Sequence, residues 1–382
     1  MTSADVVVVG GGPAGSTCAW RLRVAGLDVV VMDRAVFPRD KVCAGWITPG
    51  VVDALALDLE EYARGRVLQP ITGFRTGIIG GPTLDTAYAR AVSYGILRCE
   101  FDTYLLRRSG ARVPPGMAVE RIERVGDHWV LDGAVRAPLL VGAGGHFCPV
   151  ARHLGARRER DPLVVAQEIE LALRPEQAEE ARVRADTPEL YFCRDLEGYG
   201  WCFRKGDHLN VGLGRVDRAG LAGHVAAFRE RLVAQGRVPR DLPARWKGHA
   251  YLLYEAQRPR LVDDGVLLVG DAAGLAYPAS GEGIRPAVES GLLAAETIRA
   301  ADGRYGRADL YPYRAEVERR FGRGGIGLRL PVPAGLVATA GRALFRSRRF
   351  ARRVVLDRWF LHADEPALRV AAAGPELRLR CT

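Results

Sequence analysis

The chain has 382 residues, a net charge of +10, an apolar share of 48% and seven cysteines. No stretch approaches the ~18–20 continuous apolar residues of a membrane-spanning helix, and no signal peptide can be identified, so we expect a cytoplasmic protein. The cysteines show neither a disulfide framework nor Cys-x-x-Cys zinc spacing, so no metal site is expected. At about 150 residues per domain, the length favours two domains.

The first predicted unit is a strand, a glycine-rich turn, a helix and a second strand. Val6–Val9 and Val29–Met32 are short β-branched runs, typical of strands buried on both faces. The turn between them has the pattern G-x-G-x-x-G, with Gly10, Gly12 and Gly15. Such glycines permit a tight turn, close approach of a pyrophosphate and packing of the helix on the strand. Asp33 ends the second strand, where an acid accepts from a ribose hydroxyl. The unit predicts a dinucleotide site.

Between about 163 and 253 the pattern changes to strands with few crossover helices, which favours a mixed or antiparallel sheet. The run from Leu163 alternates at Val165, Gln167, Ile169 and Leu171, as a half-buried strand does. Residues 199–214 predict a β-hairpin with three aromatic residues on one face. These are Tyr199, Trp201 and Phe203. They form either an apolar wall for a ligand or an ordinary core face.

Lys205 ends the first strand of this hairpin. It is one of only three lysines among 55 basic residues. Lysine and arginine are not interchangeable, because one is a flexible point charge and the other a planar fork. Lys205 is therefore either a surface turn residue or a residue kept for a specific role.

A second glycine-rich turn follows a strand late in the chain. Val266–Val269 has the pattern of a buried strand, Gly270 and Asp271 end it, and a helix begins at Ile284. The loop between them contains Pro278, Gly281 and Gly283. A second helix N-terminus suits a long cofactor such as FAD.

The C-terminal part is basic. Between Arg342 and Arg358 seven arginines are interleaved with apolar residues and a single aspartate. This resembles an amphipathic helix that lies on anionic lipid, although a general preference for arginine is the alternative. Arg319, Arg320 and Arg323 are expected on a solvated helix face. No nucleic-acid-binding module is recognisable, so no nucleic-acid partner is expected.

Over about residues 4–300 the motifs resemble the geranylgeranyl reductase family of FAD-dependent oxidoreductases, which have a p-hydroxybenzoate-hydroxylase-like fold. Besides the first turn, the matching stretches are K-x-C-x-G at Lys41–Gly45, R-x-x-F-D at Arg98–Asp102, Gly142–Gly145, the Gly270–Ile284 loop, and Y-x-W-x-F-x-K at Tyr199–Lys205 followed by N-x-G at Asn210–Gly212.

The resemblance implies roles for individual residues. Asp271 would contact the ribityl chain of FAD, Arg98 would lie along the cofactor, and the backbone N–H groups from Gly281 to Ile284 would face the flavin. The full FAD-binding set expected is Gly10, Gly12, Pro13, Ala14, Gly15, Asp33, Arg34, Lys41, Cys43, Ala44, Arg98, Gly144, Gly270, Asp271, Pro278, Gly281, Gly283 and Ile284. The residues expected to line the substrate pocket are Tyr199, Trp201, Phe203 and Lys205.

Cys43 and Lys41 are the candidate catalytic residues. Cys43 would act as a modulator or as the acid, and an inert buried thiol is the alternative. Three residues depart from the family pattern. Gly144 stands where aspartate is usual, Ala44 where glycine is common, and Arg204 where proline is typical. We expect Arg204 to mark a difference in substrate. His146 and Cys148 are either reactive groups near a flavin or simply buried.

The predicted fold is α/β, with a discontinuous Rossmann-like FAD-binding domain (1–62, 84–162 and 258–300) and a mixed or antiparallel substrate domain (63–83 and 163–257). A helical, basic segment (301–382) follows. The predicted function is reduction of C=C bonds in an isoprenoid or other hydrophobic substrate by hydride transfer from reduced FAD. The alternative is an FAD-dependent monooxygenase or tailoring oxidase. NAD(P)H or another external donor, a separate reductase and peripheral membrane contact are further expectations.

Overall fold

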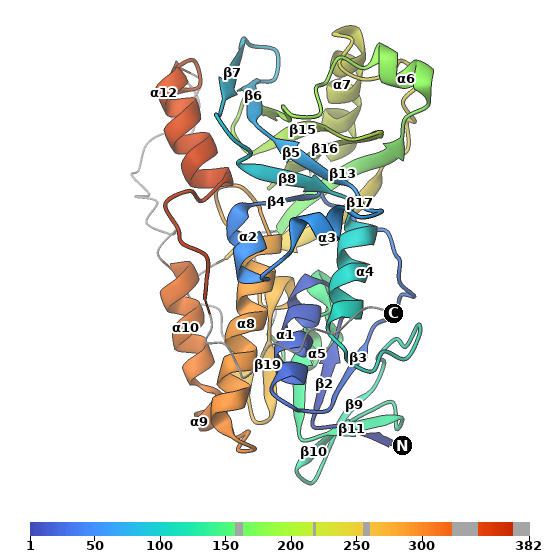
Figure 1. Ribbon diagram of the computed structural model, residues 1–382, viewed down its shortest axis with the longest axis vertical. Helices are drawn as coiled ribbons and strands as arrows, with labels where there is room; N and C mark the ends of the chain where they lie inside the picture. The colour runs from blue at the N-terminus through green and yellow to red at the C-terminus, as the bar shows by residue number, and fades with distance from the viewer. Residues whose placement is uncertain (157–162, 217–218, 255–259, 323–342, 370–382) are drawn as a thin grey trace.

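The computed structural model describes residues 1–156, 163–216, 219–254, 260–322 and 343–369. A five-stranded sheet with its helices forms one end of the molecule, and a seven-stranded sheet forms the other (Figure 1). Two smaller sheets accompany them. This mixed architecture confirms the predicted α/β class.

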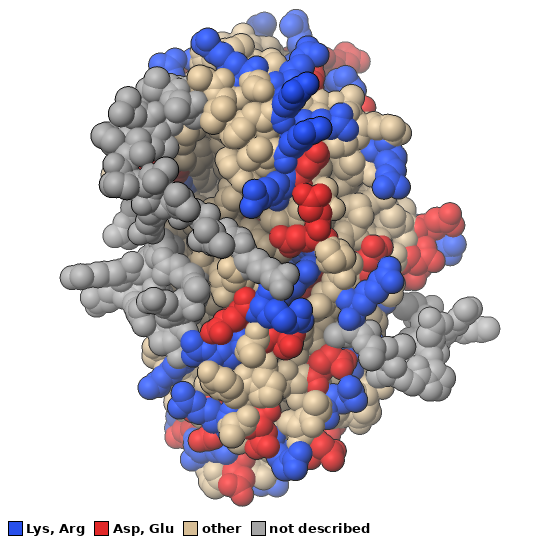
Figure 2. All heavy atoms as spheres, turned by 90° about the vertical axis from the view of Figure 1, so that its left-hand side faces the viewer, with Lys and Arg blue, Asp and Glu red and all other residues tan. Residues whose placement is uncertain are grey.

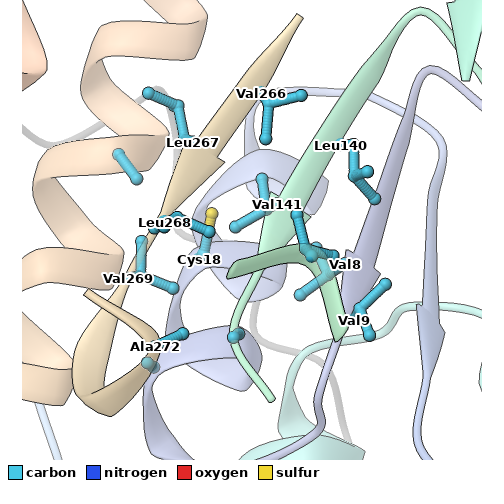
Figure 3. Packing of buried hydrophobic residues seen from close by; sticks show 14 of the residues in the cluster. Val8, Val9, Cys18, Leu140, Val141, Val266, Leu267, Leu268, Val269 and Ala272 are labelled. Atoms are coloured by element: carbon cyan, nitrogen blue, oxygen red, sulfur yellow. The ribbon is translucent and has the colours of Figure 1, made fainter. Parts of the chain in front are cut away.

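The five-stranded sheet has the order β18-β19-β12-β2-β3, and every pairing except β18–β19 is parallel. Its strands are β18 (Val262–Asp263), β19 (Val266–Leu268), β12 (Leu139–Gly142), β2 (Val6–Val9) and β3 (Val29–Met32). Valine and leucine side chains of β2, β12 and β19 pack with Cys18 in a continuous apolar core (Figure 3). Because the strands are buried on both faces, they are apolar throughout. The predicted strands are confirmed.

Long helices cover this sheet. α1 (Pro13–Val24) packs against α8 (Ile284–Ala301) and α4 (Arg98–Arg108), and α10 (Pro312–Phe321) packs on α8 (Figure 1). A Cβ atom on Gly291 would lie 2.5 Å from the Ala14 carbonyl oxygen, so α1 and α8 cross at close range. The shorter helices are α2 (Pro49–Ala54), α3 (Leu59–Ala63), η1 (Gly145–Phe147), α5 (Pro149–His153), α6 (Pro175–Glu180), η2 (Gly270–Ala272) and α9 (Arg307–Leu310).

The seven-stranded sheet has the order β17-β13-β16-β15-β14-β6-β7 and is antiparallel except between β14 and β6. Its strands are β17 (Lys247–Leu252), β13 (Leu163–Ala172), β16 (His208–Arg215), β15 (Gly198–Lys205), β14 (Glu189–Phe192), β6 (Gly73–Ile78) and β7 (Thr83–Ala87). One face packs on α7 (Leu221–Ala234). β15 and β16 confirm the predicted hairpin. β7 carries the sheet to Ala87, past the expected boundary at 83.

The two small sheets complete the fold. One is β1-β11-β10-β9 and the other is β4-β8-β5. Their bounds are β1 (Thr2–Ser3), β11 (Val135–Ala137), β10 (His128–Leu131), β9 (Ile122–Val125), β4 (Trp46–Ile47), β8 (Ser93–Ile96) and β5 (Leu68–Ile71).

The basic C-terminal region contains α12 (Arg348–Phe350) and a π-helix, η4 (Ala351–Phe360). Val355, Leu356 and Phe360 are buried among aromatic residues of the seven-stranded sheet. Its arginines are exposed, on a face where basic and acidic side chains are interspersed (Figure 2). The expected amphipathic pattern is therefore present, but its apolar side faces the protein interior. Arg342 lies outside the described residues.

Two further expectations concern helices. Arg320 is 14% exposed and paired with the buried Glu289, so the prediction that it is solvated was wrong. Arg319 is exposed, and Arg323 lies outside the described residues. Within the described ranges, no helix is long and apolar enough to cross a bilayer.

Candidate active site

A cavity of about 430 Å³ lies between the two large sheets. Its floor is formed where β2, β3 and β12 end, at Gly10, Asp33 and Ala143. Its roof is the face of the seven-stranded sheet opposite α7, including Ala166, Glu168 and Trp201. The carboxyl ends of parallel strands are the usual place for a ligand in such sheets.

The turn after β2 has the geometry of a dinucleotide cradle. Gly10 has φ +115°, and a Cβ atom there would lie 2.3 Å from the Ala143 carbonyl oxygen, so only glycine fits. Asp33 holds the turn, because its Oδ2 accepts from the Gly11 N–H at 2.7 Å. The Nη1 of Arg39 is buried without a hydrogen-bond partner among the described residues, although its Nη2 lies 3.0 Å from Asp102. An unpaired buried guanidinium N–H in this cradle suits a pyrophosphate.

The second glycine-rich turn brings Asp271, Gly283 and Ile284 to the cavity, as expected. The Gly281 N–H instead donates to the Tyr277 carbonyl oxygen at 2.8 Å, which removes it from the expected donors. Gly270 is buried and donates its N–H to Ser290 Oγ.

Gly15, Gly270 and Pro278 do not line the cavity, whereas the other fifteen residues of the expected FAD-binding set do. Gly15 and Gly270 serve packing. A Cβ atom on Gly15 would lie 1.9 Å from the Gly10 carbonyl oxygen, and one on Gly270 would lie 2.9 Å from the Ala14 Cβ. Pro278 is exposed.

The Lys41–Gly45 loop, which carries both candidate catalytic residues, is tied to the roof by side chains from four strands. Lys41 Nζ lies 2.8 Å from His249 Nε2 on β17, and the Cys43 N–H donates to Glu168 Oε1 on β13 at 2.6 Å. From β16, Asn210 Nδ2 donates to the Cys43 carbonyl oxygen at 3.3 Å. From β15, Lys205 Nζ donates to the Ala44 carbonyl oxygen at 3.1 Å. The roof therefore sets the position of the loop.

Lys205 is 1% exposed, so the alternative that it is a surface turn residue was wrong. Its Nζ also donates to the Ile96 carbonyl oxygen at 2.9 Å and pairs with Glu170. A Cβ atom on Gly95 would lie 2.8 Å from its Cγ, so the stem runs against backbone. It lies behind the cavity wall and does not line the cavity.

The hairpin aromatics divide between the cavity and the core. Tyr199 and Trp201 line the cavity, whereas Phe203 stacks on Trp46 with ring centroids 4.9 Å apart and lies behind the wall. A Cβ atom on Gly212 would lie 2.1 Å from the Trp201 ring, so the indole lies across this glycine. Trp201 Nε1 donates to Asn210 Oδ1 at 2.6 Å. The N-x-G residues thus orient the tryptophan.

Arg204 contacts the Ala178 and Gly206 carbonyl oxygens and does not line the cavity. In a strand, side chains alternate between faces, so Arg204 points away from the face that carries Phe203 and Lys205. Arg204 therefore does not reach the cavity, and the expectation that it marks a difference in substrate stays a prediction.

The charged groups around the cavity are strongly perturbed. Arg98 is held by a bidentate pair with the buried Asp102, both bonds being 2.8 Å. Burial lowers the pKa of Lys41; Asp271 opposes this effect and Arg98 adds to it. Burial, together with Lys41, lowers the pKa of His249 to about 3, so this imidazole stays neutral and accepts from the lysine. Burial raises the pKa of Glu168 to about 7. Such shifts are common in functional sites.

Sequence reasoning missed several cavity residues, which are Arg39, Trp46, Glu168, His249, Tyr251 and Phe360. The alternation of β13 was recognised, but its more buried face is the opposite one, at Val164, Ala166 and Glu168. His249 and Tyr251 alternate on β17, and that period was the available signal. Phe360 comes from the C-terminal region, where no motif pointed to the site.

Comparisons with known proteins indicate the family of the chain. Residues 5–94 match the family model described as FAD dependent oxidoreductase. The chain is 31% identical to a menaquinone reductase of Mycobacterium tuberculosis, covering 84% of this chain and 81% of that protein. It is 30% identical to a geranylgeranyl diphosphate reductase of Synechocystis, covering 83% and 81%. A geranylgeranyl bacteriochlorophyll reductase-like structure from Thermoplasma acidophilum aligns with a TM-score of 0.74 at 22% identity, covering 90% and 88%.

Proposed function

Because the chain belongs to the geranylgeranyl reductase family of FAD-dependent oxidoreductases, we propose that it reduces C=C bonds in the isoprenoid chain of a hydrophobic substrate. FAD, once bound and reduced, supplies the hydride. Asp33 would hold the adenosine ribose, Gly10, Gly12 and Arg39 would hold the pyrophosphate, and Asp271 with the Gly283–Ile284 turn would hold the flavin end.

One observation carries the proposal. The same cavity that contains the dinucleotide cradle continues to an apolar wall, made by Trp46, Ala166, Tyr199, Trp201 and Phe360. Ligand pockets are mostly apolar with a few placed polar groups, and this wall suits a chain of methyl-branched alkenes. Tyr199 is fixed, because its hydroxyl donates to the Ser280 carbonyl oxygen at 2.6 Å. The wall therefore holds its shape and excludes water from the reacting carbons.

The Lys41–Gly45 loop is the proposed catalytic edge of the cavity. Cys43 lines the cavity beside the Arg98 guanidinium, and Lys41 lines it beside His249. Lys41 would hold a hydrogen bond to the cofactor, and the Cys43 thiol would position the substrate or the flavin ring.

The test is anaerobic turnover with three probes drawn from the substrate classes that relatives are named for. These are geranylgeranyl diphosphate, a digeranylgeranylglycerophospholipid and a menaquinone. The flavin of the FAD-loaded protein is reduced chemically, the protein is mixed with each probe, and the mass of the product is determined by mass spectrometry. Reduction adds two hydrogens. Incorporation of ¹⁸O from labelled oxygen in aerobic reactions would instead favour the monooxygenase alternative, and inertness towards all three probes would contradict the proposal.

We also propose an external donor for the flavin, either NAD(P)H or a separate reductase. Steady-state oxidation of NADPH or NADH in the presence of the alkene distinguishes the two.

For the exposed arginines at 346, 348, 349, 352 and 353, we propose contact with anionic membrane surfaces through charge alone, since the apolar side of this segment is buried. Co-sedimentation with anionic vesicles that is lost at high salt would support it, and no binding at low salt would refute it.

A further inference from the structure

We propose that Glu168 is the acid that protonates the substrate alkene, an inference that rests on the proposed function. Glu168 lies on β13, in the roof of the cavity, 4% exposed. Ala166, on the same face of the strand, belongs to the apolar wall. The carboxyl group therefore stands where the polar loop and the apolar wall meet.

Only half of this carboxyl group has a structural role. Oε1 accepts from the Cys43 N–H, while Oε2 is buried without a hydrogen-bond partner among the described residues. Asn210 lies close, but its Nδ2 donates to Glu170 Oε1 and to the Cys43 carbonyl oxygen. A buried oxygen without a donor favours the protonated acid, whose O–H can be given to a ligand.

Two polar groups of the apolar wall are already hydrogen-bonded. The Tyr199 hydroxyl donates to Ser280, and the Trp201 indole donates to Asn210. Glu282 also lines the cavity, but His362 Nε2 lies 3.4 Å from its Oε2. Burial alone would lower the pKa of His362, yet hydrogen bonds to Glu282 and Glu365 raise it to about 9, so a cation faces Glu282. Among the described residues Glu168 forms no ion pair of this kind, although the nearby Lys205 lowers its pKa.

Burial favours protonation of Glu168 near neutral pH, and the groups that face it act in both directions. Glu170 lies on its own strand, Lys205 on β15, and Lys247 and His249 on β17, while Lys41 and Cys43 come from the loop. Lys205 pairs with Glu170, Lys247 pairs with Asp40, and His249 is neutral. Burial raises the pKa of Glu168 to about 7, and Glu170 adds to this effect, whereas the Cys43 N–H, Lys205 and Asn210 act in the opposite direction.

The π pair of the alkene forms one new C–H bond with the proton of Glu168 Oε2, and the other carbon takes a hydride, which reduced FAD supplies. The alkene gains two electrons and FAD is oxidised. Glu168 is left as a carboxylate and takes a proton from water before the next turnover.

Glu168→Gln is the sharpest test, because the amide oxygen can still accept from Cys43 N–H while the acidic proton is lost. Pre-reduced enzyme is mixed anaerobically with geranylgeranyl diphosphate or a menaquinone, whichever the wild type reduces, and flavin reoxidation is followed across pH. We expect a wild-type rate that falls as pH rises through about 7, and a loss of about 10²–10⁴-fold with no such titration in the variant. Glu179→Gln, on the exposed surface of α6, is the matched control.

A second readout does not depend on turnover. Difference infrared spectroscopy of the FAD-loaded protein should show a protonated carboxyl band that disappears as pH rises through neutrality and is absent from Glu168→Gln. A Glu168→Gln enzyme with wild-type rate and pH profile overturns the inference while leaving the proposed function standing. A wild type that reduces no probe removes both.

Discussion

A Lys205→Met variant tests whether the buried lysine of the hairpin contacts the substrate or stabilises the fold. In the structure its Nζ donates to the carbonyl oxygens of Ala44 and Ile96 and pairs with Glu170. Methionine keeps the length of the stem but removes all three interactions. Two carbonyl groups then lose this donor, and Glu170 keeps Asn210 Nδ2 but loses its cation.

The expected cost follows from burial. Removing one partner of a buried ion pair costs about 3–5 kcal/mol. Glu170 is partly solvated, because its side chain is 24% exposed. We therefore expect the free energy of unfolding to fall by about 3 kcal/mol, the lower end of that range. Lys247→Met is the matched control, because Lys247 pairs with Asp40 at the surface, with 68% and 76% side-chain exposure. Exposed pairs contribute about 0–1 kcal/mol.

Urea denaturation of the FAD-loaded protein measures both variants. Adding Glu170→Gln to Lys205→Met should restore part of the loss, because the unpaired carboxylate is then gone. A Lys205→Met variant with wild-type stability and a raised KM would refute the structural role of Lys205. It would favour the substrate contact that the motif had suggested.

Three further predictions test other parts of the structure. Gly10→Ala places a Cβ atom 2.3 Å from the Ala143 carbonyl oxygen at φ +115°. The purified variant should therefore carry less than a tenth of the wild-type flavin, measured as the ratio of flavin to protein. Full flavin occupancy would contradict the assignment of this turn to dinucleotide binding. Gly212→Ala places a Cβ atom 2.1 Å from the Trp201 ring, so flavin content should persist while alkene reduction falls at least tenfold and tryptophan fluorescence shifts; unchanged turnover would exclude Trp201 from the wall. The pKa of His362 is raised to about 9 in the folded protein. Protonated His362 therefore stabilises the fold, by about 3 kcal/mol at most. This contribution is fully present below about pH 6.5 and is lost as pH rises through 9. His362→Asn, which tolerates the positive φ of 47°, should abolish this loss of stability in denaturation measured between those pH values; an unchanged slope would refute it.

The sequence predicted local structure well where one pattern determines it. The apolar runs at Val6–Val9 and Val29–Met32, the turn at Gly10 and the hairpin around Trp201 all lie where expected. Each depends on short-range physics: β-branched residues for buried strands, glycine for positive φ, and alternation for a sheet face.

Long-range contacts were beyond such patterns. Glu168 is a charged residue in a strand, which normally indicates the solvent face, and only the pairing of β13 with β16 and β17 turns it towards the cavity. Phe360 reaches the site from a region with no recognisable motif. Lys205 was singled out by its rarity, yet its burial depends on the packing of Gly45 and Gly95 against it.

The most direct test of the account is the mass of the product formed when anaerobically reduced, FAD-loaded protein meets an isoprenoid alkene. We expect a product heavier by two hydrogens, with flavin reoxidised in equal amount. A hydroxylated product formed with oxygen, or no reoxidation with any of the three probes, would contradict the claim that this cavity reduces C=C bonds.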